Sequence, residues 1–220
     1  MNLTNKDYFT FNVNNSALVV GQTASGKTEL VRTYMRRLEK AYKPGEMKYV
    51  IFDLKQVEFS IDIDDGAKEE YLYAPVLTDP KEGIKLLVEL ADLVYERAEA
   101  NPDGKSKPKP FIFIYIEECE MAYEDPEKFV DSVVKINKFA EKANVKLIYS
   151  TSRVSDPIAV PKELLKSFEL LLCGVISIDD SKYPGVPNYQ LNSPGMIQYD
   201  FVLYEQKANE SMLWTYFIDG

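Results

Sequence analysis

A glycine-bracketed loop that carries a lysine and a threonine occupies residues 21–28, which read GQTASGKT. Where such a loop joins a strand to a helix, its backbone N–H groups can surround phosphate oxygens, and the helix dipole adds positive potential. In this pattern Lys27 brings a charge to the β- and γ-phosphates of a nucleotide, and the Thr28 hydroxyl is a ligand for Mg²⁺. The loop therefore predicts a site for ATP and Mg²⁺; a chance glycine turn is the alternative.

The glycines of this loop have separate expected roles. Gly21 permits the sharp exit from the preceding strand, and Gly26 lets the backbone approach the phosphate closely. We expect the nucleotide to contact the whole stretch, namely Gly21, Gln22, Thr23, Ala24, Ser25, Gly26, Lys27, Thr28 and Glu29.

Hydrolysis needs further groups, because an acid must place the metal and a base must orient the attacking water. The segment FIFIYIEECE, residues 111–120, places Glu117 and Glu118 directly after a continuously apolar run. Open α/β sheets bind their ligands at the carboxyl ends of the strands. We therefore predict that Glu117 supports Mg²⁺ and that Glu118 is the base that activates water. The alternative is that both carboxylates begin a solvated loop.

A polar cluster follows another apolar run, in YSTSRVS, residues 149–155. Thr151 or Ser152 could sense the γ-phosphate through a hydroxyl, and Arg153 could do so through its charge. A surface turn capped by serines explains the same residues, so both interpretations stay open. The candidate catalytic residues are thus Lys27, Glu117, Glu118 and Arg153.

Alternating strands and helices must position these residues. Apolar runs predict strands at residues 16–20, 47–53, 111–116, 145–150 and 169–177, with one or two more within 195–204 and 211–219. Apolar stripes at helical spacing predict helices after Thr28, after Asp79-Pro80, after Asp125-Pro126 and around 161–167. In the first helix, Leu30, Tyr34, Leu38 and Ala41 form the expected stripe. The alternation predicts a mostly parallel sheet with helices on both faces, in one domain over residues 1–220.

Composition narrows the function further. The 220 residues contain no histidine, which excludes histidine triads and imidazole-bound zinc. The net charge of −9 argues against a surface coated with nucleic acid, but it permits a local basic patch or a pore built by several subunits. No apolar run approaches the roughly 20 residues of a membrane span, and the two cysteines are expected to be buried free thiols. We expect a cytoplasmic protein.

Two charged loops have plainer explanations than a binding site. Residues 61–71, IDIDDGAKEEY, lack the spacing of an EF-hand and indicate a solvated acidic loop. Residues 104–110, GKSKPKP, could touch DNA phosphates, but an exposed linker is preferred because no aromatic residue is interleaved.

In this order, the motifs resemble the motor domain of the FtsK/SpoIIIE family of DNA translocases, within the FtsK–HerA group of P-loop ATPases. The similar stretches are LVVGQTASGKTEL, VIFDLKQVEFSI, residues 74–99, FIFIYIEECE, KLIYSTSRVSD and residues 175–200. The resemblance implies a RecA-like fold and a homo-oligomeric ring, a hexamer, that hydrolyses ATP with Mg²⁺ to move double-stranded DNA. Any membrane or portal anchor would come from other domains or proteins.

Several residues depart from the family pattern. Glu117 replaces an aspartate, Ser152 replaces a glutamine, and Lys182 stands near the place of an arginine that could reach a neighbouring subunit's nucleotide. Two alternatives therefore stay open beside the DNA translocase. One is a motor of a protein secretion or viral genome packaging machine. The other is a nucleotide-binding module for regulation or assembly that hydrolyses ATP only weakly.

Overall fold

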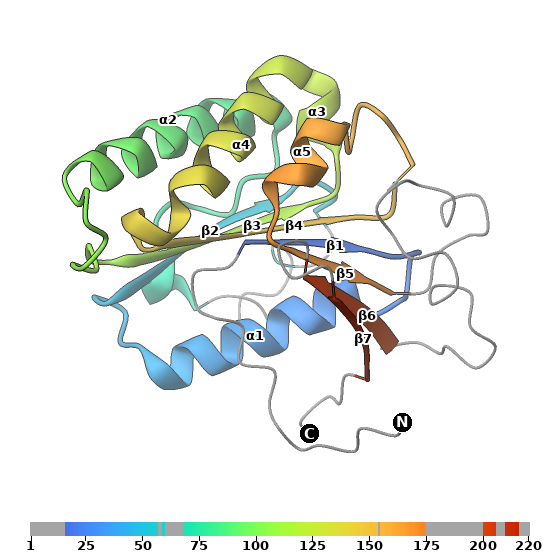
Figure 1. The fold of residues 1–220 in the computed structure, drawn as a ribbon, viewed down its shortest axis with the longest axis horizontal. Coiled ribbons are helices and arrows are strands. Elements are labelled where there is room, and N and C mark those ends of the chain that lie inside the picture. Colours follow the sequence, from blue (N-terminus) through green and yellow to red (C-terminus); the bar gives the residue numbers. More distant parts are fainter. Residues whose placement is uncertain are drawn as a thin grey trace.

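The computed structural model describes residues 16–56, 59, 68–153, 155–174, 200–205 and 210–215. Its centre is a seven-stranded sheet in the order β2-β3-β4-β1-β5-β6-β7 (Figure 1). The strands are β1 (Ala17–Val20), β2 (Met47–Asp53), β3 (Phe111–Glu117), β4 (Val145–Thr151), β5 (Leu170–Cys173), β6 (Asp200–Glu205) and β7 (Glu210–Thr215). Strands β1 to β5 pair in parallel, whereas β6 and β7 are antiparallel additions at one edge.

Helices cover both faces of the sheet (Figure 1). The helices are α1 (Lys27–Ala41), α2 (Pro80–Glu99), α3 (Glu120–Glu124), α4 (Pro126–Ala143) and α5 (Lys162–Ser167), with a 3₁₀ turn at Glu69–Tyr71. Helix α1 lies on one face, and α2 to α5 lie on the other. Asp79 caps α2 by accepting hydrogen bonds from the backbone N–H groups of Lys81 and Glu82, and a proline follows as the first helical residue.

The central strands are buried on both sides, which explains their continuously apolar sequences. Leu18 and Val20 of β1 pack in the core beneath α2 and α4, while Ala17 and Val19 pack in the core beneath α1. Every residue of β3 is buried. The parallel pairing therefore brings the C-terminal ends of β1, β3 and β4 to the same end of the sheet.

The predicted fold class, a RecA-like sheet of mostly parallel strands with additional strands near the C-terminus, is confirmed by this arrangement. The predicted stripe of α1 is wrong only at its end: Leu30 and Leu38 are buried and Tyr34 packs against the core, whereas Ala41 is exposed. The face that packs on the sheet is wider than predicted, because Val31 and Met35 are also buried. The short helix α3 lacks a clear apolar stripe and was not predicted.

Both cysteines, Cys119 and Cys173, are buried and free, as predicted. Within the described part of the chain, no helix combines the length and apolarity that a bilayer span requires. The cytoplasmic location and the single-domain boundaries stay predictions.

Candidate nucleotide site

The loop between β1 and α1 has the backbone of a phosphate-binding turn. Gly26 directly precedes α1 with a φ of 96°, in the left-handed region where glycine is unstrained, and Ala24 shares this region with a φ of 64°. Gly21 directly follows β1. Its backbone is not left-handed, but an added Cβ would lie 2.5 Å from the Ser25 Oγ.

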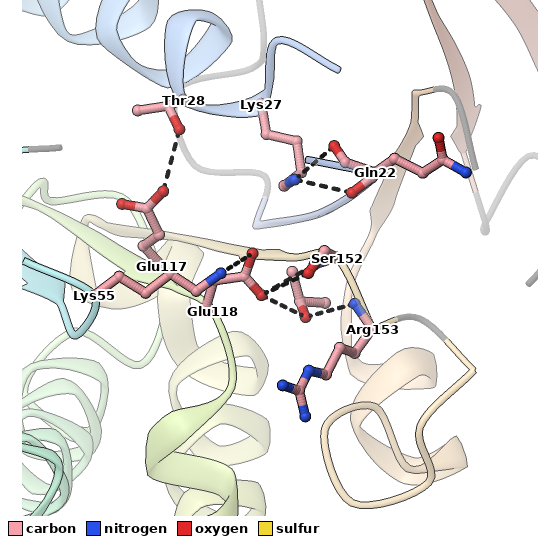
Figure 2. Close-up of polar contacts among 10 residues, drawn as sticks. Gln22, Lys27, Thr28, Lys55, Glu117, Glu118, Ser152 and Arg153 are labelled. Atoms are coloured by element: carbon pink, nitrogen blue, oxygen red, sulfur yellow. Dashed lines mark hydrogen bonds and ion pairs between the residues drawn. The ribbon is translucent and has the colours of Figure 1, made fainter. Parts of the chain in front are cut away.

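Lys27 folds back across this loop (Figure 2). Its ammonium group donates hydrogen bonds to the carbonyl oxygens of Gly21, at 2.9 Å, and Gln22, at 3.1 Å. The residue is buried at the first position of α1. The backbone of the loop thus holds a positive charge at the N-terminus of a helix, where the dipole also favours an anion.

Thr28 and Glu117 meet across the sheet edge. The Thr28 hydroxyl donates a hydrogen bond to Glu117 Oε1 at 3.1 Å (Figure 2). Glu117 is the last residue of β3 and is buried, so the alternative of a solvated loop is wrong for this carboxylate. A hydroxyl and a carboxylate are the hard oxygen ligands that Mg²⁺ prefers, and the pair therefore fits a magnesium site.

Glu118 is also buried, and its backbone has a φ of 64°, which is strained for a residue with a side chain. Its backbone N–H donates to the Ser150 carbonyl at 2.7 Å, which holds the turn against β4. One carboxylate oxygen, Oε2, accepts from Thr151 Oγ1 at 3.3 Å and from the Ser152 N–H and Oγ, each at 3.1 Å. The other, Oε1, pairs with Lys55 Nζ at 3.1 Å.

These partners keep Glu118 ionised. Burial alone would raise the pKa of this carboxyl group, but the hydrogen bond from the Ser152 N–H and the charges of Lys55 and Lys27 outweigh it. The pKa of Glu118 is therefore lower than its usual value. A buried carboxylate that stays charged beside a phosphate-binding loop is suited to accept a hydrogen bond from water.

Arg153 lies at the rim of this site. Its backbone N–H donates to Thr151 Oγ1 at 3.1 Å, but its guanidinium group points away from Lys27 (Figure 2). That group donates to the Tyr123 hydroxyl at 3.2 Å and lies 5.6 Å from the centre of the Tyr123 ring. The Tyr123 hydroxyl in turn donates to Asp156.

The structure therefore brings together the predicted loop, Glu117, Glu118 and Ser152, whereas the guanidinium of Arg153 faces α3. Lys182 lies outside the described residues. No role of Lys55 is predicted from the sequence, although the residue lies within the family-like segment VIFDLKQVEFSI. Lys55 lies two residues beyond β2, and it reaches Glu118 because Asp53 of β2 is paired in register with Glu117 of β3, a pairing that the sequence does not specify.

Comparison with known proteins identifies the family. A profile of the FtsK/SpoIIIE family matches residues 3–154. The chain belongs to this family. The membership confirms the predicted class of enzyme, a P-loop ATPase, and agrees with the RecA-like sheet described above.

Individual relatives show the same relationship over different lengths. The DNA translocase SpoIIIE of Bacillus subtilis is 28% identical over 163 residues, which cover 63% of this chain and 20% of the relative. The chain thus corresponds to about a fifth of that protein's length.

Two solved structures share the fold. One is Thermomonospora curvata EccC (ATPases 2 and 3) in complex with a signal sequence peptide, with a TM-score of 0.73 and 15% identity, covering 96% of this chain and 38% of EccC. The other is the genome packaging NTPase B204 of Sulfolobus turreted icosahedral virus 2 in complex with AMPPCP. Its TM-score is 0.61 and its identity 19%, covering 94% of this chain and 100% of B204.

Proposed function

We propose that this chain is a translocase motor domain that hydrolyses ATP with Mg²⁺ and moves double-stranded DNA through a homo-oligomeric ring. The observation that carries the proposal is the meeting of the Lys27–Thr28 loop with two buried glutamates in a member of the FtsK/SpoIIIE family. The relative in Bacillus subtilis is named a DNA translocase, which favours DNA as the cargo.

Each residue of the site has a role in this proposal. Residues 21–29 bind the triphosphate, and the Lys27 ammonium exchanges its two carbonyl partners for phosphate oxygens. Thr28 and Glu117 would hold Mg²⁺, which supplies positive charge to the phosphates when bound. Glu118 accepts a hydrogen bond from the attacking water and takes its proton. Arg153 and Lys182 are candidates for contacts with a neighbouring subunit's nucleotide.

The substitution of glutamate for aspartate at Glu117 is compatible with this role. The longer side chain still reaches Thr28, with 3.1 Å between Oε1 and the hydroxyl oxygen. Ser152 also keeps a function in the site, because both its N–H and its hydroxyl donate to Glu118. These contacts favour hydrolysis over a module that only binds nucleotide.

A second cargo is favoured by the charge of the chain. The net charge of −9 disfavours broad contact with DNA phosphates, and a protein substrate would be compatible with it. The EccC structure, which contains a signal sequence peptide, has the same fold. We therefore keep a protein secretion motor as the second candidate.

ATP turnover with and without duplex DNA distinguishes these cargoes. The DNA motor predicts faster turnover with DNA at low salt, and retention of DNA in gel-shift assays that weakens as salt rises. A protein motor predicts no effect of DNA in either assay. Molecular mass in solution with ATP and DNA tests the ring, and a persistent monomer would contradict it.

A further inference from the structure

The turn after β2 holds Lys55 at the edge of the nucleotide site. Asp53 is fully buried, and its Oδ2 accepts a hydrogen bond from the Phe59 N–H at 2.8 Å. The Gln56 N–H donates to the Asp53 carbonyl at 3.1 Å, and Gln56 has a left-handed φ of 56°. Phe59 is buried and packs edge-on against Tyr115 of β3, with 5.4 Å between ring centres. Asp53, before Lys55 in the chain, and Phe59, after it, are therefore both held in the core.

The two oxygens of the Glu118 carboxylate have different partners, Lys55 on one side and residues of β4 and the turn after it on the other. The Lys55 ammonium contacts Oε1 at 3.1 Å, whereas Thr151 and Ser152 donate to Oε2 (Figure 2). The side chain of Lys55 is 42% exposed and that of Glu118 only 6%. The ion pair thus links a partly exposed lysine to a buried carboxylate. The other oxygen of that carboxylate, Oε2, already accepts hydrogen bonds from Thr151 and Ser152.

A partner on each oxygen matters because the final torsion of a glutamate side chain has broad, shallow minima. Donors on Oε2 alone hold that oxygen, but coupled changes of the other side-chain torsions can still tilt the carboxylate plane about it and move Oε1. The Lys55 ammonium on Oε1 removes this freedom. The plane of the carboxylate decides where a hydrogen-bonded water can lie, so it decides the direction of the attack.

We propose that Lys55 is a positioning residue that fixes the carboxylate plane of Glu118 for ATP hydrolysis. This inference rests on the proposed function of Glu118 as the group that orients the attacking water. Lys55 acts through Glu118 and needs no contact with the nucleotide. Its loss should therefore slow the chemical step and leave ATP affinity unchanged.

The test compares Lys55→Met, Lys55→Arg and a control, Lys85→Met. Lys85 lies in α2, its side chain is 68% exposed, and it forms an ion pair with Glu82 at 3.7 Å. For each variant, kcat and KM for ATP are measured with Mg²⁺, ATP affinity is measured by calorimetry, and the unfolding midpoint shows that the chain is folded.

The expected result is a fall in kcat of roughly 10- to 100-fold for Lys55→Met, with KM and ATP affinity unchanged. Lys55→Arg should restore most of the rate, because a guanidinium group also donates to Oε1. Lys85→Met should match the parent. If Lys55 had only a structural role, Lys55→Met would lower the unfolding midpoint. The fall in kcat would then not be selective, because KM and ATP affinity would change with it.

Two results would overturn the inference while leaving the proposed function intact. One is an unchanged kcat in Lys55→Met, whether or not KM rises. The other is a raised kcat, which would mean that Lys55 restrains Glu118. A parent chain without turnover, or a Glu118→Gln variant as fast as the parent, would refute the proposed function and the inference with it.

Discussion

Two substitutions of Glu118 distinguish the effect of its charge from the effect of its hydrogen-bond acceptor. Glu118→Gln removes the charge, and Glu118→Ala removes both. Glu118→Gln keeps an oxygen that can accept from Ser152 and Thr151, but it loses the negative charge and with it the ion pair with Lys55. Because the side chain of Lys55 is 42% exposed, this pair contributes at most about 1 kcal/mol to stability. Lys55 can then turn into solvent.

Glu118→Ala removes the acceptor as well. The hydroxyls of Thr151 and Ser152 can rotate toward other partners, but the Ser152 N–H is fixed and partly buried. An unsatisfied donor of this kind costs about 1–3 kcal/mol. The strain of the left-handed backbone is the same in both variants, since glutamine and alanine both carry a Cβ.

Thermal unfolding and ATP turnover measure the two effects. For a chain of this size, each kcal/mol of lost unfolding free energy lowers the unfolding midpoint by roughly 2–4 °C. The midpoint of Glu118→Ala should therefore lie about 2–12 °C below that of Glu118→Gln. Both variants should lose roughly 10²- to 10⁴-fold in kcat, because neither carries the base, while Glu118→Gln still binds ATP. Equal unfolding midpoints would refute the stabilising role of the Ser152 contact, and parent-like turnover in Glu118→Gln would refute the catalytic role.

Three further predictions concern the cap, the thiols and the metal. Asp79→Ala should lower stability by about 0.5–2 kcal/mol in denaturant titrations, because the first N–H groups of α2 lose their acceptor; an unchanged midpoint would contradict this. Cys119 and Cys173 should react with a disulfide reagent at pH 8 only after unfolding, because both are buried and burial raises the pKa of the Cys119 thiol to about 11; rapid labelling of the native chain would count against this. Chelation of Mg²⁺ should abolish turnover, and added Mg²⁺ should restore it; turnover that persists in excess chelator would remove the metal from the account.

Much of the fold follows from local patterns in the sequence. The apolar run that became β3 is long and continuous because both faces of this central parallel strand are covered, and this made it easy to recognise. The aspartate and proline before α2 act through adjacent backbone groups, so the start of that helix also follows from the sequence. Helix α3 is too short to show a period, and it escaped prediction for that reason.

The site was only partly predictable. The phosphate loop has a fixed spacing, and strand-end carboxylates can be located without knowing which strands are neighbours. The contact of Lys55 with Glu118 depends on the pairing of β2 with β3, which the sequence pattern does not specify. The turn of Arg153 toward Tyr123 depends in the same way on the placement of α3.

The central claim is that the loop before α1 binds a triphosphate that the adjacent glutamates help to hydrolyse. The most direct measurement is Mg²⁺-dependent ATP turnover of the parent chain and of Lys27→Ala under identical conditions. The account predicts turnover in the parent and its loss in the variant, because the ammonium group that lies against Gly21 and Gln22 is the one proposed to bind phosphate. A folded Lys27→Ala chain that hydrolyses ATP as fast as the parent would contradict it.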